Sequence, residues 1–244
     1  MKEFYERTYC KNQGGQPKSS LYRLVLRGTF GRLIATRYDL AYAFLPGGGS
    51  ILDVGCGGDL TVMPLLDKYQ EVYGVDISEV CVGSVNERFR DNPRIHVRVE
   101  DVNRRLGFCG ATFDTILALA VLEHVFDPYH FVEECFRLLK HNGTLVLLVP
   151  NVAWLGNRLR LAMGRLPVTS SGEEGWDGGH LHYFTIGSLK RLLQNKGFKV
   201  KRVAYGGPSR RFWGSLLSME ILVVAEKSLS PMCSGPSCDG STTS

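Results

Sequence analysis

The sequence lacks any apolar run long enough to cross a membrane. A bilayer-spanning helix needs about 20 consecutive apolar residues, and the longest apolar runs in this 244-residue chain have only the length of a strand. The first residues, Met-Lys-Glu-Phe-Tyr-Glu-Arg, also lack the apolar core of a signal peptide. The sequence therefore predicts a cytoplasmic protein without a transmembrane segment.

Four of the seven cysteines lack the spacing of a zinc site or of a disulfide framework. These four fall in or beside apolar segments and are interpreted as small buried hydrophobic residues: Cys56, Cys81, Cys109 and Cys135. Cys233 and Cys238 lie in a tail rich in serine, glycine and proline. A disulfide or metal role for these two stays open, although this composition favours a disordered end over residues 228–244.

The composition is that of one folded domain with additions. Hydrophobic residues make up 44% of the chain, which is enough for one large core at this length. The net charge is +5, and basic side chains concentrate in the first forty residues: Lys2, Arg7, Lys11, Lys18, Arg23, Arg27, Arg32 and Arg37. Such a surface suits an anionic substrate, a peripheral membrane contact or nucleic acid, and equally a solvated helix face.

The segment Ile51-Leu-Asp-Val-Gly-Cys-Gly-Gly-Asp59 joins a short apolar run to a glycine-rich loop. The apolar run predicts a buried strand of a parallel sheet, and Gly55 and Gly57 let the backbone turn sharply and approach a ligand. An NAD-binding loop needs a third small residue where this chain has Leu60. The loop therefore predicts a nucleotide-like cofactor other than NAD, with Asp59 as a helix N-cap.

Later strands also carry polar residues at their carboxyl ends. Val72–Asp76 ends in a carboxylate, Ile95–Val99 runs into Glu100 and Asp101, and Phe113–Leu119 runs into Val121-Leu-Glu-His-Val125. Because parallel strands end at one edge of a sheet, we expect a ligand site at that edge. Asp76 follows the glycine loop by about twenty residues, where a carboxylate can accept hydrogen bonds from ribose hydroxyls.

The alternation of strand and helix patterns predicts an α/β protein with a Rossmann-like, doubly wound sheet. We expect helices over 60–69 and 78–90, one capped by Asp127 with Pro128 at its first position, and one capped by Thr185. The sheet is expected to continue with a strand over 144–149 and to be mostly parallel, with an antiparallel pair over 198–205 and 219–225. Residues 1–45 are expected to form a helical lid, residues 46–227 the main domain, and residues 151–187 within it a substrate-side insertion.

Six motifs occur in a fixed order between about residues 45 and 200: Asp53-Val-Gly-Cys-Gly57, Gly74-Val-Asp76, Glu100-Asp-Val102, Phe113-Asp114, Leu122-Glu-His-Val125 with Asp127-Pro128, and Leu138-Leu139 leading into Gly143–Pro150. This set resembles the class I S-adenosylmethionine-dependent methyltransferases, in particular the group that contains ubiquinone-biosynthesis and MetW-like enzymes (methyltransferase types 11 and 23). Asp59 departs from the pattern, because that position is usually a third glycine in the family.

The resemblance implies S-adenosyl-L-methionine as the cofactor. It implies that the glycine loop packs against the methionine portion, that Asp76 holds the ribose and that Ile77 covers one adenine face. Asp101 meets the adenine edge, with Glu100 as its alternative, and Leu119 lies beside the sulfonium. The predicted cofactor-binding residues are Asp53, Gly55, Cys56, Gly57, Asp76, Ile77, Asp101, Val102 and Leu119.

Two histidines are candidate catalytic bases. His124 follows the predicted strand 113–119, and an imidazole there can accept a proton from a hydroxyl substrate; a helix-capping or core role stays an alternative. His180 begins the segment Gly179-His-Leu-His-Tyr-Phe-Thr185, which resembles a substrate-side segment of bacterial sugar and polysaccharide methyltransferases. Glu123 and His124 alone, without further ligands, do not make a metal site, so the sequence predicts no metal.

Three other residues are candidate substrate contacts. His182 lies two positions after His180, and the two histidines could be a base and an orienter, a metal pair, or one functional and one structural residue, of which we favour the last. Tyr183 and Trp176 could form a wall of the pocket, although aromatic packing in the core explains them equally well.

The motifs predict an enzyme that transfers a methyl group to an oxygen or nitrogen of a small metabolite, sugar or lipid-linked intermediate. Nucleic acid is a weaker alternative, because the fourth strand runs into Ala118-Leu-Ala-Val121 and not into the Asn/Asp-Pro-Pro-aromatic motif of enzymes that methylate base amines. A cofactor-binding regulatory protein without turnover is the third possibility. The sequence does not specify the acceptor or the oligomeric state.

Overall fold

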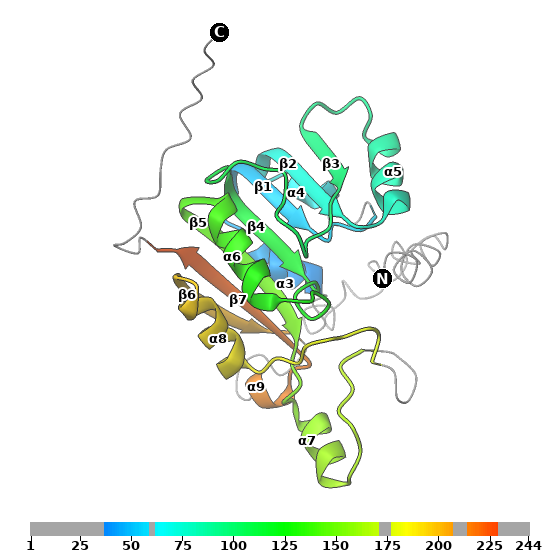
Figure 1. The fold of residues 1–244 in the computed structure, drawn as a ribbon, viewed down its shortest axis with the longest axis vertical. Coiled ribbons are helices and arrows are strands. Elements are labelled where there is room, and N and C mark those ends of the chain that lie inside the picture. The colour runs from blue at the N-terminus through cyan, green and yellow to red at the C-terminus, as the bar shows by residue number, and fades with distance from the viewer. Residues whose placement is uncertain (1–36, 59–61, 171–176, 207–213, 229–244) are drawn as a thin grey trace, which may run out of the picture.

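Buried apolar strands form the centre of the protein, and helices cover both faces of the sheet (Figure 1). The computed structural model describes residues 37–58, 62–170, 177–206 and 214–228. The strands are β1 (Gly48–Val54), β2 (Tyr69–Asp76), β3 (Ile95–Val99), β4 (Phe113–Leu119), β5 (Leu139–Pro150), β6 (Phe198–Tyr205) and β7 (Glu220–Lys227). The helices are α3 (Arg37–Phe44), α4 (Val62–Leu65), α5 (Glu79–Arg88), α6 (Pro128–Leu138), α7 (Leu155–Ala162), α8 (Ile186–Asn195) and α9 (Gly214–Leu217).

The described strands pair in the order β3-β2-β1-β4-β5-β7-β6. The first five are mutually parallel, whereas β7 runs antiparallel to both β5 and β6. This is the predicted Rossmann-like, mostly parallel sheet with an antiparallel C-terminal pair. Because β1, β2 and β4 are parallel, their carboxyl ends meet at one edge, and every loop with a predicted ligand role leaves from that edge.

Each face of the sheet has its own core. Phe131 of α6 and Leu189 of α8 belong to one cluster, which packs on alternate residues of the strands such as Leu147. Leu40 of α3 belongs to the other cluster, together with buried residues of α5 such as Val85. Central strands are therefore apolar on both sides, which explains why their sequences are nearly continuous hydrophobic runs.

Local sequence signals fix where two of the covering helices begin. Asp127 caps α6 by accepting from the backbone N–H groups of Tyr129 and His130, and Pro128 occupies the first turn. Thr185 caps α8 and accepts from the N–H of Ser188, whose hydroxyl in turn accepts from the N–H of Thr185. Both helix starts are as predicted.

Other element boundaries differ from the prediction. β5 begins at Leu139, five residues before the predicted start at Thr144, because Leu139 already pairs with Phe113 of β4, ahead of an irregularity in the register that ends at Thr144. The described part of the helix after the glycine loop is short, Val62–Leu65. Cys81 is disulfide-bonded, so its interpretation as only a small buried hydrophobic residue was wrong.

The segment after β5 contains a helix that the sequence pattern did not indicate. α7 projects from the sheet edge (Figure 1) and exposes apolar side chains, among them Leu159 and Leu161. Of the expected lid, the structure describes only α3 and the turn after it. Asp59, Trp176 and residues 229–244 also lie outside the described residues. Within the described residues, no helix is both long and apolar enough to span a bilayer.

Candidate active site

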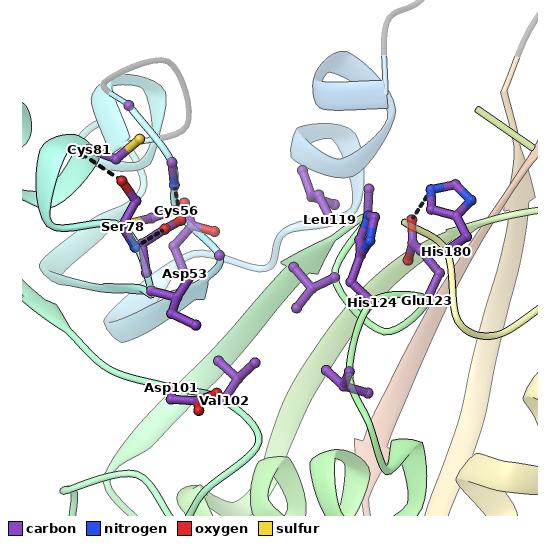
Figure 2. Close-up of a pocket in the computed structure, with 18 of the residues that line it drawn as sticks. Asp53, Cys56, Ser78, Cys81, Asp101, Val102, Leu119, Glu123, His124 and His180 are labelled. Atoms are coloured by element: carbon purple, nitrogen blue, oxygen red, sulfur yellow. Dashed lines mark hydrogen bonds and ion pairs between the residues drawn. The ribbon is translucent and has the colours of Figure 1, made fainter. Parts of the chain in front are cut away.

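One cavity of about 400 Å³ opens at the carboxyl edge of the sheet. Its wall contains all nine residues that the sequence predicted to bind cofactor: Asp53, Gly55, Cys56, Gly57, Asp76, Ile77, Asp101, Val102 and Leu119. It also contains both predicted bases, His124 and His180, at the end away from the glycine loop (Figure 2). A single space therefore joins the cofactor motifs to the candidate catalytic groups.

Asp76 links the glycine loop to the end of β2. One carboxylate oxygen accepts from the backbone N–H of Gly57 at 2.9 Å, and the other accepts from the N–H of Ser78, also at 2.9 Å. The N–H groups of Gly55 and Cys56 donate to the carbonyl of Val75. These bonds hold the loop close to β2 and orient the Asp76 carboxylate in the cavity wall, where it retains lone pairs for a ligand hydroxyl.

The acidic pair after β3 has two different surroundings. Asp101 accepts from both the backbone N–H and the side-chain amide of Asn103, at 3.0 and 2.9 Å. Glu100 is held by Arg98, with 3.1 Å between Oε1 and Nε. Both acids line the cavity, so the geometry retains the two alternatives for the adenine edge.

The Cys56 thiol is buried beside the glycine loop. Burial is the main cause that raises its pKa, and the negative charges of Asp53 and Asp76 raise it further. The thiol therefore stays protonated at neutral pH and acts as a packing group, not as a nucleophile.

Glu123 lies in the loop after β4 and is only 1% exposed. Burial raises the pKa of its carboxyl to about 8. The Glu123 carbonyl accepts from the backbone N–H groups of Leu181 and His182, at 2.8 and 3.1 Å. This pairing brings the segment around His180, distant in sequence, to the end of β4.

His124 and His180 lie next to each other, with ring centroids 4.7 Å apart and planes at 72°. The Nδ1 of His124 is 3.2 Å from the carbonyl of Gly179. Burial is the main cause that lowers the pKa of His124 to about 4, and the nearby His180 lowers it further. Burial also lowers the pKa of His180, and this effect outweighs the opposing charge of Asp177. Both rings are therefore neutral at physiological pH.

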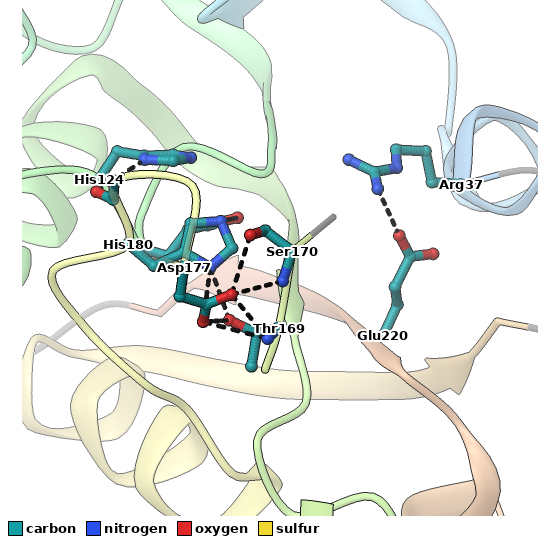
Figure 3. Close-up of polar contacts among 9 residues, drawn as sticks. Arg37, His124, Thr169, Ser170, Asp177, His180 and Glu220 are labelled. Atoms are coloured by element: carbon teal, nitrogen blue, oxygen red, sulfur yellow. Dashed lines mark hydrogen bonds and ion pairs between the residues drawn. The ribbon is translucent and has the colours of Figure 1, made fainter. Parts of the chain in front are cut away.

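Thr169 and Asp177 hold the His180 ring from behind (Figure 3). The Thr169 hydroxyl lies 2.6 Å from Nδ1 of His180 and donates to the Asp177 carboxylate at 2.5 Å. Asp177 also accepts from the N–H groups of Thr169 and Ser170. Burial raises the pKa of Asp177, but these hydrogen bonds prevail and lower it overall, so the group is an anion.

The sequence did not reveal this support. Thr169 and Asp177 lie in a segment without periodicity, and no motif marked them. The sequence indicates Glu123 only as the neighbour of His124. Arg37, which lines the cavity and pairs with Glu220 at 2.9 Å (Figure 3), was noted only as one of many basic residues.

The two predicted substrate contacts that the structure describes, His182 and Tyr183, do not join the cavity. His182 places its Nε2 3.3 Å from the carbonyl of Phe126, and Tyr183 is 46% exposed. Neither belongs to the cavity wall. Of the two histidines in Gly179–Thr185, His180 lines the cavity and His182 does not.

The chain matches a methyltransferase domain family over residues 26–203. It is 32% identical over 186 residues to a ubiquinone biosynthesis O-methyltransferase of Maricaulis maris, covering 72% of this chain and 71% of that protein. It is 27% identical over 162 residues to the mitochondrial ubiquinone biosynthesis O-methyltransferase of Bos taurus, covering 64% of this chain and 43% of that protein.

Solved structures show the same fold. An S-adenosylmethionine-dependent methyltransferase from Mesorhizobium loti superposes with a TM-score of 0.60 at 19% identity, over 82% of this chain and 99% of that one. The chain spans 59% of the length of a probable S-adenosylmethionine-dependent methyltransferase of Mycolicibacterium smegmatis and 43% of the length of the Bos taurus enzyme.

Proposed function

The chain belongs to the S-adenosylmethionine-dependent methyltransferases, and from this premise we propose that it transfers a methyl group to an oxygen of a small metabolite, sugar or lipid-linked intermediate. A nitrogen acceptor is the alternative. The names of the curated relatives favour oxygen, because they describe O-methyltransferases.

The observation that carries the proposal is the shared cavity. Its glycine loop and Asp76 suit the methionine and ribose portions of S-adenosylmethionine, while Glu123 and the two histidines lie at its far end. We propose that the nine lining residues predicted from the sequence hold the cofactor there. The cofactor supplies an electrophilic methyl group, and the protein's task is to place an acceptor oxygen in line with it.

In the proposed transfer, the acceptor oxygen forms the new bond to carbon while the carbon–sulfur bond breaks and its electron pair stays on sulfur. A hydroxyl acceptor must also lose its proton. We propose His124 and His180 as the candidate groups that receive it, because both are neutral and both line the cavity. In this proposal the glycine-loop end of the cavity positions the cofactor. The histidine end removes the proton from the acceptor.

The test is to incubate the full chain with methyl-labelled S-adenosylmethionine and a panel of hydroxyl and amine compounds, with RNA and DNA as further members. We expect label on a hydroxyl compound. Calorimetry with S-adenosylhomocysteine and NAD in parallel tests the cofactor. Equal affinity for NAD would contradict the proposal, and S-adenosylhomocysteine binding without transfer to any acceptor would favour a non-catalytic role.

A cytoplasmic place of action and a lid formed by residues 1–45 remain predictions of the sequence. The mammalian relatives are named as mitochondrial proteins, so the compartment needs its own measurement. Localisation of the tagged chain in its native cell would provide it.

A further inference from the structure

His180 is held by a chain of side chains that ends in a carboxylate (Figure 3). Asp177 accepts from the Thr169 hydroxyl at 2.5 Å, and the oxygen of that hydroxyl lies 2.6 Å from Nδ1 of His180. The side chains of Asp177 and His180 are only 11% and 6% exposed. Because little water reaches this chain, its charge and its hydrogen bonds act on the ring more strongly than they would in solvent.

The hydrogen bonds of this chain determine which nitrogen of His180 carries the proton. The Thr169 hydroxyl donates its single proton to Asp177, so its oxygen accepts from Nδ1 of His180. Neutral His180 therefore has its lone pair on Nε2. That nitrogen lies 4.0 Å from Oε1 of Glu123, beyond hydrogen-bond distance, and both residues line the cavity. An acceptor hydroxyl in the cavity can therefore reach the lone pair.

The neighbouring His124 has a weaker support. Its Nδ1 faces the carbonyl of Gly179 at 3.2 Å, which is a neutral acceptor. Burial is the main cause that lowers the pKa of His124 to about 4, so this ring is a weak base at neutral pH. The charge of Asp177 is the largest effect that opposes burial in His180 and the smallest one in His124.

We propose that His180 is the base that removes the acceptor proton, and that Thr169 and Asp177 are the residues that position it. This inference rests on the proposed methyl transfer and selects between its two candidate bases. The hydroxyl fixes the tautomer of the ring, and the carboxylate stabilises the charge that the ring acquires. A base oriented in this way by a third group recurs in enzymes of unrelated folds.

In the proposed step the O–H bond of the acceptor breaks and its proton forms a bond to Nε2 of His180. The oxygen keeps the electron pair and bonds to the methyl carbon, while the pair of the carbon–sulfur bond stays on sulfur. The ring is then an imidazolium whose Nδ1 lies 3.7 Å from the Asp177 carboxylate. After the products leave, Nε2 returns the proton to water.

Four further charged or titratable groups face His180 or Asp177: Arg37, Glu123, His124 and Tyr183. Burial raises the pKa of Glu123 to about 8, so this carboxyl is uncharged at neutral pH. Among the described residues the Thr169 hydroxyl bonds only to Asp177 and His180. Substitutions of Thr169 therefore change the support of His180 and leave the four other groups in place.

The tautomer is tested by ¹⁵N NMR of the histidine rings in the full chain, which requires no turnover. We expect His180, identified by the signal that His180→Gln loses, to be protonated on Nδ1. Thr169→Val keeps the side-chain shape but removes the hydroxyl and should mix the two tautomers, whereas Thr169→Ser should retain the parental one. A parent protonated on Nε2, or an unchanged tautomer in Thr169→Val, would overturn the proposal.

The consequence for catalysis is tested with the hydroxyl compound that takes up most label in the acceptor panel. We expect kcat to fall about 10–100-fold in Thr169→Val at an unchanged acceptor KM and to recover in Thr169→Ser, because part of the contribution of the base is lost. Asp177→Asn should also move the acid limb of the kcat profile to lower pH, since the imidazolium loses its anion and the pKa of His180 falls further. Asp91→Asn, an exposed aspartate in the turn after α5, is the matched control.

Circular dichroism and S-adenosylhomocysteine affinity show whether each variant remains folded. Asp177 also accepts backbone N–H bonds, so if Asp177→Asn does not fold, the two Thr169 variants, which retain those bonds, decide the outcome. A normal kcat in Thr169→Val, or a larger loss of turnover in His124→Ala than in His180→Ala, would overturn the proposal. Absence of label on any acceptor would contradict the proposed function alone, because the NMR result still supports or overturns the positioning of His180.

Discussion

The Asp76 carboxylate has two roles. It accepts hydrogen bonds from the backbone N–H groups of Gly57 and Ser78, and it lines the cavity where the ribose is proposed to bind. A longer or shorter side chain cannot serve both tasks, because the backbone bonds fix where the oxygens lie. The residue therefore couples the shape of the glycine loop to ligand binding.

Replacing Asp76 with Ala should weaken S-adenosylhomocysteine binding by roughly 2–5 kcal/mol, since two hydrogen bonds with a charged acceptor are lost. Calorimetry measures the affinity, and thermal unfolding checks that the sheet is intact. Asp91→Ala, an exposed aspartate in the turn after α5, is the control and should bind as the parent does. An unchanged affinity in Asp76→Ala would remove the ribose assignment.

The two glycines of the loop should respond differently to alanine. Both have positive φ, +68° for Gly55 and +58° for Gly57, so each substitution costs about 1–2 kcal/mol of strain. A Cβ on Gly55 would also lie 2.6 Å from Val121 Cγ2, whereas a Cβ on Gly57 meets no atom of the described residues within 4 Å. We expect Gly55→Ala to unfold more easily than Gly57→Ala by about 1–3 kcal/mol.

Urea denaturation measures this difference between the two glycine variants. Adding Val121→Ala to Gly55→Ala should recover most of it, because the second substitution removes the contact. If the double variant recovers nothing, steric crowding is not the cause.

Among the elements, α6 fixes a loop by a buried ion pair. Glu134 accepts from Arg137 at 2.6 and 2.8 Å and from the backbone N–H of Leu106 at 2.8 Å. Arg137 donates in turn to the carbonyls of Leu106 and Phe108. The helix thereby holds the chain that leads from the cavity edge into β4.

Burial raises the pKa of Glu134, but the bonds from Arg137 and Leu106 prevail and lower it overall. A carboxyl with a lowered pKa stabilises the fold above its unfolded pKa of about 4.3, and this contribution is lost as pH falls through the folded value. Glu134→Gln should therefore cost about 1.5–3 kcal/mol at neutral pH and progressively less in acid.

Urea unfolding at neutral pH and at about pH 3 measures the effect of Glu134→Gln. Glu133→Gln is the matched control: its 67% exposed side chain pairs with Lys196, and its loss should cost less than about 1 kcal/mol. If the difference in unfolding free energy between Glu134→Gln and the parent does not become smaller in acid, the charge of Glu134 is not the cause of the stabilisation.

At the scale of the whole molecule, α3 contributes buried residues to the core. Leu40, Ala41 and Leu45 are buried under the sheet, and Arg37 reaches the cavity wall. The carbonyls of Tyr42 and Leu45 accept from Lys68. The predicted boundary between lid and domain at residue 45 is therefore tested with two truncations, one that ends before α3 and one that removes it.

Deleting residues 1–36 should leave the unfolding transition of the sheet largely unchanged, because α3 stays in place, while weakening acceptor binding if the preceding residues act as a lid. Deleting residues 1–45 should lower stability by several kcal/mol, since a buried leucine alone contributes about 2–5 kcal/mol. Thermal unfolding compares the two truncations with the full chain. Equal stability of both would show that α3 is not part of the core.

The sequence alone was sufficient for the order of the strands, the caps of α6 and α8, and the glycine loop with Asp76. These features depend on neighbours in the chain: apolar periodicity, a capping side chain or a glycine at a turn. That the nine proposed cofactor residues line one cavity follows from parallel strands that end at one edge. Their individual roles are what the resemblance to the methyltransferase family implies. Features that depend on contacts between segments distant in sequence could not be predicted in this way.

Only the tertiary structure decided which histidine joins Glu123 and His124. His180 lies beyond an irregular segment, and its position follows from the backbone bonds that Leu181 and His182 make to the end of β4. The support of its ring by Thr169 and Asp177 follows from the same folding of that segment. Such contacts leave no periodic trace in a sequence, because nothing in the local chain requires them; the energy that selects them is that of satisfying buried polar groups in the folded protein.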